Sequence, residues 1–600
     1  AVVSMTLRTT PNRATRRRLR LYRRRVQRNE QVVLRVLAVG VGAAAAFVEI
    51  LFRLTYSGIQ GGALGFTDTD VVTFAADQPW WWLLLGPALG GLVIGAFVQR
   101  YMPEGRPHAV ADAIAAASVP REGLRLMTGV KAALVNAASI GVGASVGREG
   151  PMVHAGATLG SVVASALSLQ RSSMRTLLGC GVAAGVAASF NAPIAGVFFA
   201  LEVVIRHYAL NAFAPIVIAS VTGTVVSRWW YGDFPAFVPP ESYGLASQWE
   251  FLAFAVLGVV CAGMAIALMQ AIMRAGDAFR ASPLPIWTRP GVAGLAVGAM
   301  AALGLPHVLG VGYEATSAAL AEAYDLELLA LLAVAKIAAT ALCLGAGFGG
   351  GVFSPSIYIG AMTGGVFGLL VTAAFPEVSA SPGAYAIVGM GAVAGSVLGA
   401  PISTILIVFE LTGNYELTVG VMVATVIASE ITANTFARSL FHWQLARRGI
   451  NLRGGEEDAV LHDISVAALV HRDIITARPE TPLADLYERL GHSTQRAVYV
   501  LDAGDRLLGE VSFAVMAEAL ARDDAAESLQ AQDVMRPARS VVTLDGDLAE
   551  ALDIFGASSQ NALPVVDNQR EQHFQGLLRG YDLMRAYHKA LREVREVEQN

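Results

Sequence analysis

The apolar sequence of this chain falls into segments of two lengths. Seven runs are long enough to cross a membrane as helices, near residues 32–55, 80–100, 123–145, 211–230, 248–275, 326–346 and 415–440. Shorter runs interrupted by glycine and proline lie between them, near 109–118, 151–168, 174–190, 192–206, 290–304, 355–376, 383–398 and 401–412. A helix can be interrupted inside a bilayer only where protein or a water-filled cavity surrounds the non-helical backbone. The sequence therefore predicts a polytopic α-helical membrane protein with broken helices, and not a simple bundle.

Composition and charge support a membrane location. The chain of 600 residues is 54% hydrophobic and only 15% charged, which argues against an ordinary soluble protein. Ten arginines lie between Arg8 and Arg28, just before the first apolar run, and Arg447-Arg448 follow the last one. The positive-inside rule then places both termini in the cytoplasm, and we expect the plasma (inner) membrane of a bacterium. A nucleic-acid-binding arm is the alternative interpretation of residues 1–29, disfavoured beside a membrane segment.

One short motif carries charge inside an apolar region. Gly147-Arg148-Glu149-Gly150-Pro151 places a guanidinium and a carboxylate among alanine, valine, glycine and serine. Charge at membrane depth is costly and usually faces a cavity, a partner or an ion path. Pro151 suits the first turn of a helix, whose free N–H groups can bind an anion. The motif predicts an anion site at a helix start with Glu149 beside it; a salt bridge between Arg148 and Glu149 is the alternative.

The membrane region contains an internal repeat. Lys131 lies before Gly147–Pro151 at nearly the same spacing along the sequence as Lys336 lies before Gly351–Pro355. Ala-Pro-Ile then recurs, with Glu202 nine residues after the first proline and Glu410 nine after the second. We expect two transmembrane halves, 30–235 and 245–446, with a substrate site where their broken helices meet. Glu202 and Glu410 are interpreted as structural caps or pairing groups. For Lys131 and Lys336, attraction of anions and binding of buried carbonyl or carboxylate groups are both open.

The composition changes after Arg447, and residues 457–600 alternate short apolar strands with charged segments. Two units, about 465–525 and 531–590, each read as strand, helix, strand, strand and helix. This duplicated pattern resembles a tandem CBS domain pair, a cytoplasmic regulatory module that often binds adenine nucleotides. Asp582 occupies the position where many such domains bind a ribose, whereas Val515 stands there in the first unit. Both an adenine-nucleotide site and a dimerising or gate-coupling module remain open.

Four motifs of the membrane region together resemble the CLC family of chloride channels and chloride/proton antiporters. They are Gly147–Pro151, Gly350-Gly-Val-Phe-Ser-Pro355, Phe190-Asn-Ala-Pro193 and Phe409-Glu-Leu-Thr-Gly413. The resemblance covers essentially all of 30–447. It implies an inverted repeat of broken and tilted helices, and a homodimer in which each subunit has its own path for chloride.

The resemblance also implies roles for individual residues. Glu149 matches the family's external gating glutamate, which competes with chloride and swings away when protonated. The set implied for anion binding comprises Gly147, Arg148, Gly150, Gly351, Val352 and Phe353, together with His108 and Ala109 in the first anion motif and Phe441 at the position of the central tyrosine. His108 replaces a serine hydroxyl, and Phe441 lacks the tyrosine hydroxyl, which would weaken anion binding on the inner side.

Val203 stands where the antiporters usually carry an inner glutamate for protons. Valine is also common there in plasma-membrane CLC channels. We therefore expect transport of chloride and similar small monovalent anions with weak or absent proton coupling. An obligate chloride/proton antiporter that uses a route without this glutamate is the alternative. The resemblance also disfavours fluoride-specific exchange, because the family members known for it tend to lack the proline found here at Pro151.

Other classes of function fit less well. A divalent-cation transporter with CBS regulation needs acidic side chains along its path, and few are present. A sensor or structural protein would not explain why a carboxylate, Glu149, stands in this apolar region. No pairing of nucleophile and base suggests an enzyme, and no cofactor is expected to be required. No spacing suggests a metal site, because Cys180, Cys261 and Cys343 all lie in apolar runs and read as core residues.

Overall fold

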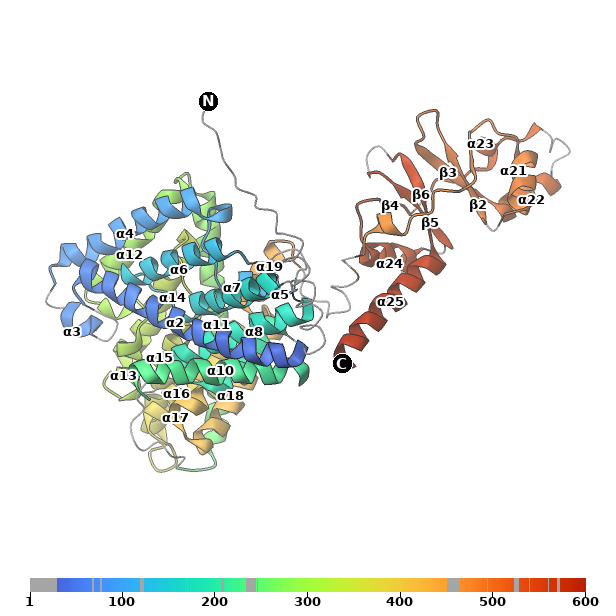
Figure 1. The fold of residues 1–600 in the computed structure, drawn as a ribbon. Helices are drawn as coiled ribbons and strands as arrows, with labels where there is room; N and C mark the ends of the chain where they lie inside the picture. The colour runs from blue at the N-terminus through green and yellow to red at the C-terminus, as the bar shows by residue number, and fades with distance from the viewer. Residues whose placement is uncertain are drawn as a thin grey trace, which may run out of the picture. The chain divides into compact units, whose positions relative to one another are not determined.

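The computed structural model describes residues 30–599 apart from short gaps. The gaps are 67–69, 76–77, 119–123, 168, 170, 207–209, 234–243, 245, 451–460, 462–463, 494, 523–527, 539, 559 and 569–571. The chain divides into two compact units, Ala1–Asn451 and Leu452–Asn600. The first is entirely helical where it is described, and the second combines helices with two small sheets (Figure 1). The predicted basic segment 1–29 lies outside the described residues.

Helices of the first unit occur in two matching sets. The first set is α2 (Glu30–Leu64), α3 (Val71–Ala75), α4 (Trp80–Tyr101), η1 (Pro103–Gly105), α5 (Val110–Ser118), α6 (Leu126–Gly141), α7 (Glu149–Leu167), α8 (Arg171–Phe190), α9 (Pro193–Phe199), the π-helical η2 (Ala200–Ile205) and α10 (Leu210–Tyr231). The second set is α11 (Glu250–Ala281), η3 (Ile286–Thr288), α12 (Arg289–Ala302), η4 (Pro306–Val308), α13 (Tyr313–Leu320), α14 (Leu326–Ala346), α15 (Phe353–Ala374), α16 (Pro382–Leu398), α17 (Pro401–Thr412), α18 (Tyr415–Thr435) and α19 (Leu440–Arg447).

The two sets pack in the same way. α7 lies against α8 as α15 lies against α16, and α10 contacts α8 as α18 contacts α16. The long helices α2 and α10 lie side by side (Figure 1), as do α11 and α18. The repeat predicted from the short motifs therefore extends to the packing of whole helices.

Eight helices of the described chain are long and apolar enough to cross a membrane. They lie at 31–64, 80–101, 172–190, 212–231, 250–281, 326–346, 353–374 and 415–447. The predicted crossing at 123–145 is wrong, since its helix α6 spans only 16 residues. The runs at 174–190 and 355–376 were predicted to be short, but they form long helices, because their glycines pack against neighbours and do not break the backbone.

Exposed tryptophans cluster at helix ends, as expected for a membrane protein. Trp80 begins α4, Trp229 lies in the last turn of α10, and Trp249 immediately precedes α11. All three side chains are exposed on this unit. Indole rings favour the boundary between lipid and water, so these positions mark helix ends near a membrane surface.

Glycines allow the close contact of α7 with α8 and of α15 with α16. A Cβ atom on Gly156 would lie 2.1 Å from the carbonyl oxygen of Gly181. At the matching place in the second set, a Cβ on Gly360 would lie 2.3 Å from the carbonyl oxygen of Gly389. Small residues let membrane helices approach closely where apolar burial alone provides little driving force.

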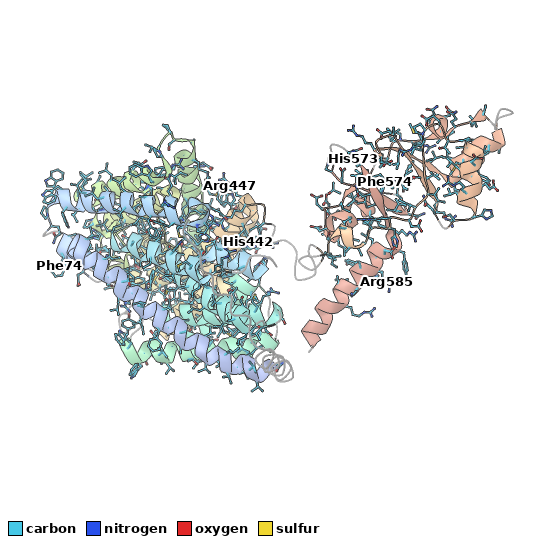
Figure 2. All side chains as sticks on the ribbon, turned by 45° about the horizontal axis from the view of Figure 1, so that its top comes forward. Phe74, His442, Arg447, His573, Phe574 and Arg585 are labelled. Carbon is cyan, nitrogen blue, oxygen red and sulfur yellow. The ribbon has the colours of Figure 1, made fainter. Side chains whose placement is uncertain are left out.

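The second unit contains two similar halves. Its elements are η5 (Val466–Ala468), β1 (Thr476–Ala477), α21 (Leu483–Gly491), β2 (Ala497–Leu501), β3 (Leu507–Ser512), α22 (Phe513–Arg522), α23 (Ala531–Val534), β4 (Val542–Thr543), α24 (Leu548–Ala557), β5 (Ala562–Val566), β6 (Phe574–Arg579) and α25 (Gly580–Gln599). β1 pairs in parallel with β2, which pairs antiparallel with β3, and β4, β5 and β6 repeat this order. Each sheet has its own apolar core, and exposed Arg585 projects from α25 (Figure 2).

Replacing Gly156 with alanine should destabilise the helical unit. The added methyl group would meet backbone, which cannot rotate away, so we expect a loss of about 1–3 kcal/mol. Thermal unfolding of the purified protein in detergent measures this change. Gly263→Ala in α11 is the matched control, because no atom lies within 4 Å of its built Cβ. Equal unfolding midpoints for the two variants would contradict the close-packing argument.

Candidate functional site

The two helix sets meet at Gly147 and Gly351, the first residues of their matching motifs. Each glycine N–H donates to the carbonyl oxygen of the other at 2.7 Å, which forms an isolated antiparallel bridge. A Cβ on either residue would collide with the opposite motif or with Glu149. The bridge brings the N-terminal ends of α7 and α15 together, and N-terminal ends carry the unpaired N–H groups that favour negative charge.

Glu149 is held at this junction by hydroxyl groups of the second helix set. Ser354 Oγ lies 2.6 Å from both carboxylate oxygens, and the Tyr313 hydroxyl donates to Oε1 at 2.6 Å. The Glu149 side chain is buried, with 3% of its surface exposed. Sequence reasoning missed both donors. Ser354 lies within a motif that was noted, but nothing in the local sequence distinguishes Tyr313.

The Arg148 side chain makes its hydrogen bonds with residues other than Glu149. It donates to the hydroxyls of Tyr313 and Tyr56 at 3.2 Å each and to the Ser189 carbonyl at 3.0 Å. Its Nε lies 3.9 Å from Glu149 Oε1, beyond hydrogen-bond distance. A direct salt bridge, the alternative considered for this motif, is therefore at most a loose contact. The guanidinium instead links three helices around the junction.

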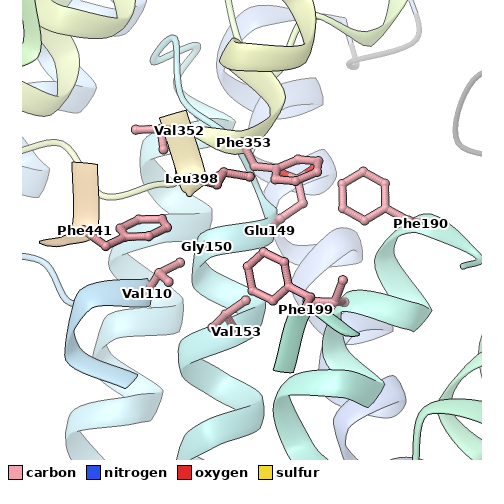
Figure 3. Close-up of a pocket in the computed structure, with 11 residues that line it drawn as sticks. Val110, Glu149, Gly150, Val153, Phe190, Phe199, Val352, Phe353, Leu398 and Phe441 are labelled. Carbon is pink, nitrogen blue, oxygen red and sulfur yellow. The ribbon is translucent and has the colours of Figure 1, made fainter. Parts of the chain in front are cut away.

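A small cavity lies beside Glu149. Figure 3 shows Phe441 and Val352 on one side of it and Phe190 and Phe199 on the other, with Glu149 between them. The remaining lining residues are Val110, Gly150, Val153, Val186, Phe353 and Leu398. Of the residues predicted for the anion site, Glu149, Gly150, Val352, Phe353 and Phe441 thus line one space. They come from α7, α15, α19 and the residue that precedes α15.

Two predicted residues of the first anion motif lie outside the lining of this cavity. His108 and Ala109 do not line this cavity, and the nearby residue that does so is Val110. The Ala109 N–H donates to the Asp112 carboxylate at 3.0 Å, so it is not directed at an anion. The His108 carbonyl accepts a hydrogen bond from Asn136. The aspartate caps its own helix start, which explains why this backbone is engaged.

Glu202 and Glu410 cap helices of opposite sets. Glu410 accepts hydrogen bonds from the N–H groups of Ile194 and Ala195 at 2.9 and 2.7 Å, at the start of α9. Glu202 accepts from Ile402 and Ser403 at 3.1 and 2.8 Å, at the start of α17. The predicted structural role of both glutamates is confirmed. Val203, the next residue in η2, is a buried apolar side chain.

The lysines of the repeat bind backbone. Lys336 is fully buried and donates to the carbonyls of Val308 and Gly310 at 3.1 and 3.0 Å. Lys131 donates to the Tyr101 carbonyl at 3.3 Å. Of the two interpretations left open, binding of carbonyl groups is the one the contacts support. Within the described residues, no group of three or more His, Cys, Asp or Glu side chains could hold a metal ion.

Comparison with known proteins decides the family. The family model described as voltage gated chloride channel matches residues 90–433, more than half of the chain. The chain belongs to the voltage-gated chloride channel family. Two CBS domain matches, at 466–522 and 531–589, follow the channel match. The predicted CLC-type helical fold and CBS pair are both confirmed.

Several relatives of this chloride channel family member are similar over most of their length. It is 34% identical over 415 residues to a putative chloride channel protein ClcB-like of Ralstonia nicotianae, covering 68% of this chain and 95% of the relative. It is 28% identical to the H(+)/Cl(-) exchange transporter ClcA of Salmonella arizonae, covering 72% and 92%. The family thus consists of anion channels and transporters and is not a family of enzymes.

Solved structures agree on the fold. A slow cyanobacterial Cl-/H+ antiporter aligns with a TM-score of 0.62 over 69% of this chain and 97% of its own, at 21% identity. A eukaryotic CLC transporter aligns with a TM-score of 0.60 over 94% and 98%, also at 21% identity. The second alignment includes the CBS region as well as the helical unit.

In the CBS pair, Asp582 is already engaged. Its Oδ2 lies 2.8 Å from Nε2 of His471, a residue whose backbone pairs with Leu577 of β6. The exposed fraction of the His471 side chain is 42%, so solvent reaches this pair. A ribose at the Asp582 carboxylate would have to compete with the imidazole.

Replacing Arg148 with lysine should destabilise this CLC protein. A lysine ammonium cannot reproduce the spread of donors that contact Tyr56, Tyr313 and Ser189 together. We expect a loss of about 3 kcal/mol, because buried acceptors would lose charge-assisted hydrogen bonds. Thermal unfolding in detergent measures the loss, with exposed Arg35→Lys in α2 as the control. Equal stability of both variants would show that the guanidinium contacts contribute little.

Proposed function

We propose that this CLC protein passes chloride and similar small monovalent anions through a path in each subunit, gated by Glu149. The observation that carries the proposal is the position of the Glu149 carboxylate, which lines the cavity and accepts hydrogen bonds from Ser354 and Tyr313. Hydroxyl donors that hold a carboxylate can also hold chloride, since both are anions that accept hydrogen bonds. Displacement of the side chain would leave these donors to the transported ion.

The anion-binding set of the proposal surrounds Glu149. It comprises Gly150, Val352, Phe353 and Phe441, which line the cavity, and Gly147 and Gly351, whose N–H groups donate to each other. Arg148 supplies fixed positive charge nearby. Phe441 brings an aromatic ring to the cavity where a tyrosine would also bring a hydroxyl. A neutral hydrogen bond contributes about 1 kcal/mol, so we expect weak anion binding at the inner end. His108 and Ala109, which were also predicted to bind the anion, lie next to the lining residue Val110 and are not given a direct contact with the anion.

Proton coupling in the proposal is weak or absent. Val203 cannot carry a proton, and the carboxylate beside it, Glu202, is bound to the start of α17. An obligate chloride/proton antiporter is the second candidate. It is favoured by the names of relatives such as the ClcA exchange transporters, and it would need another inner route for protons.

The proposed assembly is a homodimer in a bacterial plasma (inner) membrane, with both termini in the cytoplasm. Ile194 of α9 and Ile402 of α17 are about equally exposed on the helical unit, as expected for a face that a second copy could cover. The CBS pair would then act as a dimerising or gate-coupling module. No nucleic acid is expected as a partner.

Chloride efflux from liposomes tests the anion path. Full-length protein should release trapped chloride, and the rate should change with pH as Glu149 gains or loses its proton. Glu149→Gln, which resembles the protonated side chain, should remove most of this pH dependence. Exposed Glu377→Gln is the control and should behave as the unmodified protein. No flux, or a flux of cations, would reject the proposal.

Proton movement in the same liposomes separates the two candidates. If coupling is weak, an imposed chloride gradient should move few protons against their own gradient. Uphill proton movement at a fixed ratio to chloride would instead favour the obligate antiporter.

Nucleotide binding tests the role of the CBS pair. Because His471 occupies the Asp582 carboxylate, we expect no saturable heat when the full-length protein is titrated with ATP or AMP. Saturable binding that Asp582→Ala abolishes, and that exposed Asp553→Ala retains, would instead assign an adenine-nucleotide site.

A further inference from the structure

Two buried histidines lie together beside the cavity. His108 precedes α5, and His154 belongs to α7, one helical turn after Gly150. Their ring centroids are 5.8 Å apart, and the rings are tilted by 59°. The side chain of His154 is 1% exposed and that of His108 is 9% exposed. The two imidazoles therefore lie close together inside the helical unit.

Both rings carry a buried nitrogen without a hydrogen-bond partner. Nε2 of His108 and Nε2 of His154 are each unpaired, and so is Oδ1 of Asn136 in α6. The Asn136 amide nitrogen donates to the His108 carbonyl at 3.2 Å, so this amide belongs to the same cluster. More than nine in ten buried polar groups normally have a partner, which can be ordered water. Ordered water would complete the hydrogen bonding of these buried nitrogens.

The pair lies next to the lining of the cavity. Val110, two residues after His108, and Gly150, four residues before His154, both line that space. Residues four apart in a helix share a face. At a rise of about 1.5 Å per residue, His154 lies about 7.5 Å along α7 from Glu149. Because residues five apart lie on different sides of a helix, a proton bound at the pair would need a water path around α7 to reach the carboxylate.

Charged groups continue from the pair to the edge of the helical unit. His108 Nδ1 is 3.5 Å from Asp112 Oδ1 of α5. The Asp112 carboxylate accepts from Arg106 at 2.7 Å and from Arg448, just after α19, at 3.0 Å. Arg448 belongs to the cationic end that the positive-inside rule assigns to the cytoplasm.

The other elements near the pair contribute little charge. Glu104 of η1 is paired with Arg106 at 2.6 Å. The carboxylate of Glu202, in η2 beside α5, is directed at the start of α17. α6 contributes the neutral Asn136. Asp112 is therefore the anionic group in direct reach of the imidazoles.

We propose that His108 and His154 form an inner proton-binding pair that exchanges protons with Glu149 through water. A proton would bind Nε2 of one ring from the cytoplasmic side, pass between the rings and leave as it binds a Glu149 carboxylate oxygen. This inference rests on the proposed gating role of Glu149. It would give Glu149 an inner supply of protons for gating, without the fixed exchange ratio of an obligate antiporter. A purely structural pair is the competing interpretation, but packing alone leaves one buried nitrogen of each ring unpaired.

One-sided pH changes test the pair. Full-length protein in planar bilayers is exposed to acid on one face at a time while chloride current is measured. Acid on the cytoplasmic face should raise the current of the unmodified protein. In the His108→Gln/His154→Gln double variant, this response should fall to less than about a third of its size. Each current is compared with that of the same variant at neutral pH.

A matched control and two single variants complete the test. His307→Gln changes a half-buried imidazole of η4 whose Nδ1 is also unpaired, and it should keep the full response. If the double variant does not fold, His108→Gln and His154→Gln are measured singly, because either breaks the pair.

The outcomes separate this inference from the proposed function. A full cytoplasmic response in the double variant, or in both single variants, overturns the proton-binding pair. No chloride current in the unmodified protein overturns the proposed function itself. A normal current whose pH response depends on Glu149 but not on the histidines leaves the gate in place and removes only the pair.

Discussion

Two hydrogen bonds between Gly147 and Gly351 hold the centre of the helical unit together. They are reciprocal, and they join equivalent residues of the two helix sets in opposite directions. Each requires glycine, because a side chain on either residue would collide with the other motif. With this bridge in place, the starts of α7 and α15 point at one small space. The positions of Glu149, Val352 and Phe353 follow from it.

A second reciprocal contact fixes the same relation farther along the chain. Glu410 caps α9 and Glu202 caps α17, so each helix set completes a helix start of the other. Both helices begin with Ala-Pro and have no side-chain cap of their own. A carboxylate there satisfies N–H groups and complements the helix dipole. The symmetry of the two sets is therefore maintained by hydrogen bonds as well as by packing.

The sequence predicts this arrangement well where the chemistry is local. Short motifs such as Gly147–Pro151, and their repetition near Gly351, indicate the family, the repeat and the position of Glu149. Contacts between distant segments were not predictable in the same way. Tyr313 reaches Glu149 from a different helix set, and no local pattern marks it. The length of α8 was underestimated because glycine reads as a helix breaker, whereas Gly181 lies in a helix–helix contact that only the fold defines.

The partners of Glu149 and Arg148 are compatible with the proposed gate, in which the carboxylate moves and the guanidinium stays. Glu149 accepts from the hydroxyls of Ser354 and Tyr313, which are neutral, so its hydrogen-bond donors carry no charge. Arg148 donates to Tyr56, Tyr313 and Ser189, so its guanidinium stays anchored when the carboxylate leaves. A fixed positive charge next to a vacated set of donors favours an incoming anion over a cation. Under the proposed function, movement of a single side chain would alternate the site between carboxylate and chloride without rearranging the helices that hold it.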